Sequence, residues 1–164
     1  MESPARPSVL SLWPLVVALL ATTGLIAWAA PAANAWLIEH RARQVTADLR
    51  GFAGFFHSFA TEQGDWPPGD GTPAAIPAGM ESRLDSTPWV RPTAIGGHYA
   101  WEPNSVHQGL RHRAAITIVS TEGSDVSRDF RQLLAVDRLI DDGDLATGRF
   151  QLGYRNQPLL ILEH

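Results

Sequence analysis

A long run without charge lies near the start of the chain. No Asp, Glu, Lys or Arg occurs between Arg6 and Glu39, and residues 9–36 are mostly apolar. About 20 such residues suffice to cross the hydrocarbon core of a membrane. The pattern therefore predicts a membrane-spanning segment over residues 1–36.

A second helical pattern follows without a break over residues 37–63. Apolar side chains recur there at spacings of four and three, which places them on one face of an amphipathic helix. They are Val45, Leu49, Phe52, Phe56 and Phe59. We expect this face to pack against the chain's own sheet. Phe55 lies off the face and is available for a partner, and the helix is expected to stop at Gly64.

Residues 64–97 are rich in Pro and Gly and predict a long loop rather than central strands. One short helical turn is expected between Pro77 and Leu84. Large apolar side chains in this segment are expected to anchor it to the core, namely Trp66, Ile76, Met80, Leu84 and Trp89.

Residues 98–164 predict an antiparallel sheet with one helix. Strands are expected at 98–101 and 113–119 with a turn over 104–109, and a final hairpin is expected from 150–154 and 159–162. Between them lies a helix over 126–140, with its N-cap at Ser124 or Asp125. The fold class is therefore α+β, a long N-terminal helix on a small antiparallel sheet of about four strands.

Composition argues against several functions. Thirteen basic residues, all arginine, stand against 17 acidic ones and form no cluster, so nucleic-acid binding is not expected. The absence of cysteine excludes disulfides and thiolate sites. The six histidines lack ligand spacing for zinc, and Ser120 and Thr121 lack the glycines of a nucleophile elbow. We therefore expect no enzyme, and no small-molecule substrate is evident.

The N-terminal segment has two interpretations. It could be a retained anchor, or a signal peptide cut after Ala35 in Ala33-Asn34-Ala35, which would release an exported periplasmic binding or interaction domain. The apolar run exceeds the roughly 7–15 residues of a signal peptide's apolar region. It also continues directly into the next helix, so we favour the anchor. The arginines that follow it would place the domain in the cytoplasm under the positive-inside rule.

The order of elements resembles the type IV pilin-like proteins, specifically the G-like pseudopilins of type II secretion. Ala47–Arg50 through Gly64-Asp65-Trp66-Pro67 is similar to the family's helix end and its Gly-x-aromatic-Pro stop. Residues 96–101 and 140–150 are similar to the C-terminal halves of divergent members. The match spans most of the chain. It departs at the leader, because residues 6–14 contain neither the glycine nor the acid of the prepilin motif.

The resemblance implies a non-enzymatic structural subunit. Such a subunit sits in the inner membrane as a single-pass protein with its C-terminal domain in the periplasm. Its implied partners are other pseudopilin-like subunits and inner-membrane secretion components, and it acts by packing of N-terminal helices.

An acidic turn follows the predicted C-terminal helix. Its Asp and Thr side chains supply hard oxygen ligands of the kind that Ca²⁺ prefers, although their spacing differs from that of an EF-hand loop. G-like pseudopilins hold calcium in a C-terminal loop, so the resemblance implies a Ca²⁺ site. The acids of the turn are Asp137, Asp141, Asp142 and Asp144, with Thr147 nearby, and the candidate ligands are Asp141, Asp142, Asp144 and Thr147. The alternative is a helix end with solvated acids and Gly143 as its cap.

Overall fold

The computed structural model describes residues 13–164, with the side chains of residues 24–29 left aside. The chain divides into two compact units, and the boundary falls between Leu37 and Ile38. The position of the family's leader motif and the start of the predicted membrane segment lie outside the described residues.

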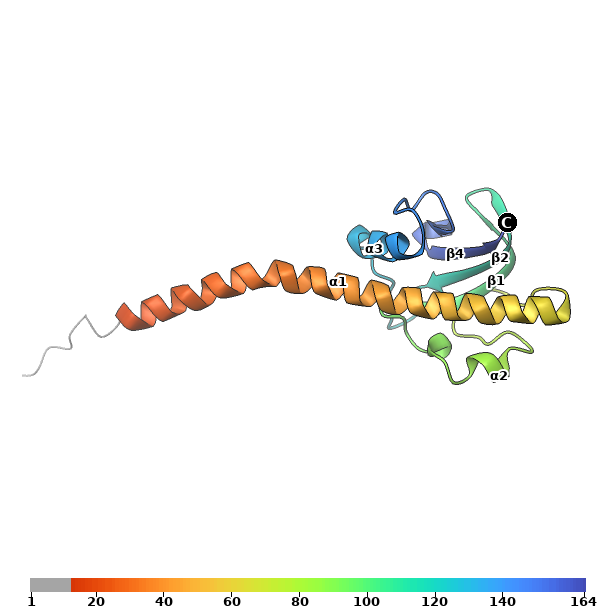
Figure 1. Cartoon of the computed structure of the whole chain (residues 1–164), viewed down its shortest axis with the longest axis horizontal. Coiled ribbons are helices and arrows are strands. Elements are labelled where there is room, and N and C mark those ends of the chain that lie inside the picture. Colours follow the sequence, from red (N-terminus) through yellow and green to blue (C-terminus); the bar gives the residue numbers. More distant parts are fainter. Residues whose placement is uncertain (1–12) are drawn as a thin grey trace, which may run out of the picture. The chain divides into compact units, whose positions relative to one another are not determined.

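Helix α1 runs from Trp13 to Gln63, and Pro31 lies inside it without ending it (Figure 1). The helix ends at Gly64, which adopts a φ of +81°. The Gly64 N–H donates to the Ala60 carbonyl over 2.9 Å. Glycine suits this position because a left-handed residue after the last turn caps the free carbonyls. The predicted end of the helix is confirmed.

The predicted membrane-spanning segment gains no support from the described part of the chain. Among those residues, no helix is both long enough and apolar enough to cross a bilayer.

The amphipathic face of α1 supplies one side of the core. Four residues of the predicted stripe are buried, and Phe59 packs partly buried against them; the four are Val45, Leu49, Phe52 and Phe56. Aromatic rings continue the contact into the domain. Phe56 stacks on Trp101 with ring centroids 4.0 Å apart, and Phe52 meets Trp89 edge-on at 5.0 Å.

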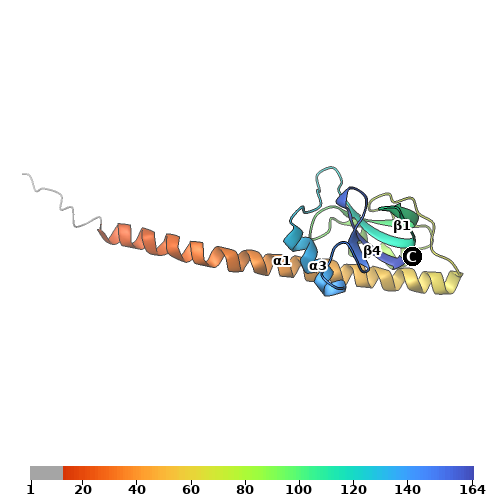
Figure 2. The same cartoon turned by 90° about the horizontal axis from the view of Figure 1, so that it is seen from above.

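The sheet has four antiparallel strands in the order β1-β2-β4-β3. They are β1 (His98–His107), β2 (Leu110–Val119), β3 (Phe150–Leu152) and β4 (Pro158–Glu163). Figure 2 shows this sheet lying over the C-terminal half of α1. The predicted α+β fold with about four strands is confirmed.

The first hairpin is longer than predicted. The expected turn over 104–109 is wrong, because β1 continues to His107 and pairs there with Leu110. Gln108 and Gly109 alone make the turn, with φ of +50° and +82°. Two-residue hairpins favour this left-handed backbone because its twist matches that of the strands.

The loop over residues 64–97 contains the short helix α2 (Glu81–Leu84) and the 3₁₀ turn η2 (Pro88–Val90). Of the predicted anchors, Met80, Leu84 and Trp89 are fully buried, and Trp66 and Ile76 pack partly buried against the core. The Trp89 indole N–H donates to the Ala75 carbonyl over 2.8 Å.

Helix α3 spans Phe130–Ile140, four residues shorter at its start than predicted. Its N-cap is Asp129, whose carboxylate accepts from the Arg131 N–H, so Ser124 and Asp125 are not the cap. Residues 126–129 are held outside the helix, since the Ser127 N–H donates to the Ile95 carbonyl over 2.7 Å. Phe130 is consequently exposed rather than buried.

Candidate functional site

The acidic turn begins where α3 ends. Asp137 lies in the last turn of α3 and faces the core beside Leu133 and Val136, whereas Asp141 and Asp142 leave the helix into solvent. Gly143 follows with a φ of +84° and reverses the chain. The buried face of α3 and the tight turn together bring the carboxylates of the three aspartates to one place.

Asp137 is the unusual member of this group. Its side chain is fully buried, and neither carboxylate oxygen makes a hydrogen bond of good geometry within the described residues. Burial, together with the charges of Asp142, Asp141 and Asp144, raises the pKa of Asp137 to about 6, and the nearby Gly143 N–H offsets only part of this. An unpartnered buried carboxylate is costly, so the position calls for a proton or a cation.

Asp137, Asp141 and Asp142 form the group that could share one cation. Each can offer one carboxylate oxygen such that these atoms lie within 4.8 Å of one another. Carboxylate oxygens from three residues fit the ligand chemistry of Ca²⁺, which takes six to eight oxygens at about 2.3–2.6 Å. The remaining ligands would be waters or carbonyl oxygens.

The other two candidate ligands, Asp144 and Thr147, make hydrogen bonds within the turn. Asp144 accepts from the Ala146 N–H over 3.0 Å, and the Thr147 hydroxyl donates to Asp142 over 2.9 Å. The Asp144 N–H and this hydroxyl lower the pKa of Asp142. The sequence therefore located the turn and two of its central acids. It counted Asp137 among the acids of the turn without naming it as a ligand, because the burial of Asp137 follows from the packing of α3.

Gly148 allows the loop to close on Asp141. The Arg149 N–H donates to the Asp141 carboxylate, and a Cβ added at Gly148 would lie 2.0 Å from the same oxygen. Backbone N–H groups of the loop after α3 thus close around the carboxylates of Asp141 and Asp144.

A second candidate is the exposed apolar surface of α1 before the domain. In the first unit, the described side chains of residues 13–20 include six large apolar ones between 44% and 70% exposed: Trp13, Leu15, Val16, Val17, Leu19 and Leu20. An apolar surface of this extent is typical of a helix that is covered by a membrane or by a partner.

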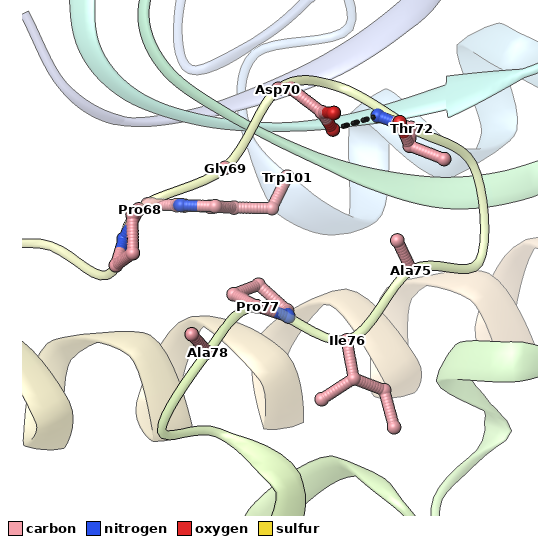
Figure 3. A pocket seen from close by; sticks show the side chains of 9 residues that line it. All are labelled: Pro68, Gly69, Asp70, Thr72, Ala75, Ile76, Pro77, Ala78 and Trp101. Carbon is pink, nitrogen blue, oxygen red and sulfur yellow. Dashed lines mark hydrogen bonds between the residues drawn. The ribbon is translucent and has the colours of Figure 1, made fainter.

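A third candidate, the pocket in Figure 3, is a structural feature of the loop. It measures about 320 Å³ and is lined mainly by residues 68–78 and Trp101. Its polar groups already have partners, because Asp70 accepts from the Thr72 N–H and the Trp101 indole donates to the Pro67 carbonyl, over 2.9 and 2.8 Å. These hydrogen bonds hold the loop in shape, so the described contacts give the pocket a structural role.

Comparison with known proteins shows the fold. No known family model and no curated protein sequence matches the chain. A solved structure, that of the major type IV pilin PilA1 from Clostridium difficile, is similar with a TM-score of 0.54 and 16% sequence identity. The match covers 77% of this chain and 97% of the pilin. The chain therefore has a pilin-like fold, as its order of elements predicts.

Proposed function

We propose that the protein is a pseudopilin-like structural subunit that assembles with other pilin-like subunits through the N-terminal part of α1. The observation that carries this proposal is the exposed apolar surface of residues 13–20 on a helix that continues into a pilin-like domain. The pilin-like fold supports the class of protein, and the exposed apolar surface of α1 gives the subunits a reason to associate with one another.

The mechanism is burial of apolar side chains between helices. Where this part of α1 lies in water, fully burying one Leu or Val contributes roughly 1.5–3 kcal/mol. Where it lies in lipid, neighbouring helices are held by close van der Waals packing instead. The domain, with its own core, then sets the spacing between subunits.

We also propose that the uncharged N-terminal segment attaches the subunit to the inner membrane, with the domain in the periplasm, where it meets inner-membrane secretion components. The run without charge from Pro7 to Ile38 supports the attachment. The periplasmic side rests on the resemblance to pseudopilins alone, since the arginines after the segment favour the opposite side. Removal of a signal peptide after Ala35 would instead cut α1 within its length. The mass of the mature protein in a membrane fraction tests retention of the segment against its cleavage, and a soluble product beginning at Trp36 would contradict the proposal. Protease added to intact spheroplasts tests the periplasmic side, and protection of the domain would contradict it.

Association is tested with two full-length copies carrying different affinity tags. We expect the copies to purify together, and Leu15→Ser with Leu19→Ser to weaken this strongly, because both side chains lie on one face of α1 four residues apart. Leu110→Ser is the matched control, since Leu110 is equally exposed but lies on the hairpin of the domain. Equal loss with the control, or no co-purification of the unchanged copies, would contradict the proposal.

We further propose that the acidic turn binds Ca²⁺ through Asp137, Asp141 and Asp142, with Asp144 and Thr147 shaping the turn. The buried and unpartnered carboxylate of Asp137 supports it. Calorimetric titration of the full chain with CaCl₂ should show one site, which Asp137→Asn abolishes and Asp85→Asn, an exposed acid in another loop, leaves intact. The absence of heat at millimolar calcium would exclude the site.

A further inference from the structure

A pocket of about 400 Å³ lies between the start of α3 and η3 (Tyr154–Asn156), the turn between β3 and β4. Leu133 and Leu152 give it an apolar lining, and Arg128 and Arg155 contribute charge. Phe130 also lines it with 62% of its side chain exposed. An apolar hollow with a cationic rim and an uncovered aromatic ring has the composition of a protein contact.

Neither arginine is neutralised within the described part of the chain. Arg131, close by in sequence, pairs with Asp129 at 2.8 Å, but Arg128 and Arg155 are exposed and make no ion pair over residues 13–164. The Arg155 guanidinium lies 5.2 Å from the ring centroid of Tyr154. In a chain with a net charge of −4, this rim is a local positive patch.

A matching negative patch lies on α2. Glu81 and Asp85 are four residues apart and exposed, and within residues 13–164 neither takes part in an ion pair. Arg83 between them is bound to Glu62 at 2.6 Å and leaves their charge uncompensated. In Figure 1, α2 lies on one side of α1 and α3 on the other, so the two patches cannot meet within one molecule.

We propose that the pocket beside Phe130 receives α2 of a second copy of this chain, with Glu81 and Asp85 facing Arg128 and Arg155. This inference rests on the proposed function as an assembling subunit. Two different patches on different sides of a molecule make a head-to-tail contact, which repeats from copy to copy rather than closing after two. Because exposed ion pairs add little free energy, the contact sets the register between subunits that α1 holds together.

The lack of cysteine permits a clean cross-linking test. Full-length copies carrying Arg155→Cys are mixed with differently tagged copies carrying Asp85→Cys and treated with a short bismaleimide. We expect a product containing both tags. Arg111→Cys, on the exposed face of the first hairpin, replaces Arg155→Cys in the matched control and should give none. Leu19→Cys copies report separately on contact between α1 helices.

The outcomes separate the inference from the proposed function. Product from Leu19→Cys without the mixed product overturns the docking of α2 and keeps assembly through α1, and failure of both overturns both. The mixed product without the Leu19 product supports the docking and removes the role of α1. Product between two Arg155→Cys copies would show a two-fold contact and overturn the proposal.

Charge reversal gives a second measurement. Copies carrying Arg128→Cys are cross-linked to copies carrying Glu81→Cys. Adding Arg155→Glu to the Arg128→Cys copies should reduce the yield of this product roughly fivefold, since one exposed ion pair is lost. Asp85→Arg in the partner copies should restore it. Reduction without restoration would show that the substitution disturbs the turn itself, and the proposed pairing would be wrong.

Discussion

At the scale of single residues, two buried polar side chains destabilise the fold rather than support it. Asp137 is a carboxylate enclosed on the buried face of α3, and among residues 13–164 it has no hydrogen-bond partner of good geometry. His112, on β2, is buried, and its Nδ1 has no partner in the part of the chain that the structure describes. Both groups cost stability in their charged forms, and both therefore make stability depend on pH.

Asp137→Asn should stabilise the calcium-free protein at pH 7.5 by about 1–3 kcal/mol. The folded-state pKa of Asp137 is about 6, above the value of 3.8 for a free side chain. The folded state therefore keeps the proton longer, and its advantage is lost as the pH rises from about 4 through 6. Denaturant unfolding in chelator at pH 4 and pH 7.5 measures this. Equal effects at both pH values would contradict it.

His112 should act in the opposite direction. Burial, with His164 and His107 nearby, lowers its pKa, so the unfolded chain binds the proton more readily. Stability contributed by neutral His112 is present above pH 6.5 and is lost as the pH falls through the lowered pKa. His112→Gln should flatten the decline in melting temperature between pH 7 and pH 5, while the exposed control His57→Gln should leave it unchanged. Parallel curves for all three proteins would refute the assignment.

At the scale of elements, two neighbouring phenylalanines of α1 differ in burial. Phe56 is fully buried and stacked on Trp101, whereas Phe55 points off the core face with 37% of its side chain exposed. Phe56→Ala should cost about 3–5 kcal/mol of unfolding free energy through lost burial and a cavity. Phe55→Ala should cost less than about 1 kcal/mol. Chemical denaturation of the two variants checks the difference, and similar losses would contradict the packing.

The helices and strands also show which features of the fold can be predicted from the sequence alone. The stripe on α1, the stop at Gly64 and the number of strands were predictable because each rests on a local period or a local backbone preference. The start of α3 was not. Val126 continues the apolar period of that helix, but it packs instead on Gly97, where a Cβ would lie 2.5 Å from its side chain. That contact joins segments far apart in the sequence, so no local pattern announces it.

The candidate metal site was half predictable for the same reason. Asp141 and Asp142 stand out as acids at a helix end, and Asp144 and Thr147 share their turn. Only the packing of α3 reveals that Asp137 faces inward and that the Asp144 carboxylate is engaged by the Ala146 N–H. The sequence shows which acids lie close together along the chain, whereas burial in the fold decides which carboxylates need a cation.

Calcium should couple the turn to the stability of the domain. A ligand that binds only the folded state stabilises it by about 2.7 kcal/mol at 100 times its Kd. We therefore expect CaCl₂ to raise the melting temperature of the unchanged protein and to leave Asp137→Asn where it was. An equal rise in both would assign the effect to general screening of an acidic chain.

The whole molecule combines a pilin-like domain with a helix whose first part exposes apolar side chains. The fold is shown by its likeness to a type IV pilin, and assembly is proposed from the exposed surface. If assembly is specific, neighbouring helices touch along one face. If the apolar residues merely aggregate, they touch on every side.

A scan of single cysteines over residues 13–23 of the full chain separates these cases most directly. Assembly through α1 predicts cross-linking yields between copies that rise and fall every three to four residues, following one helical face. Yields that are flat along the scan, or absent at every position, would contradict the proposal that this helix joins one subunit to the next.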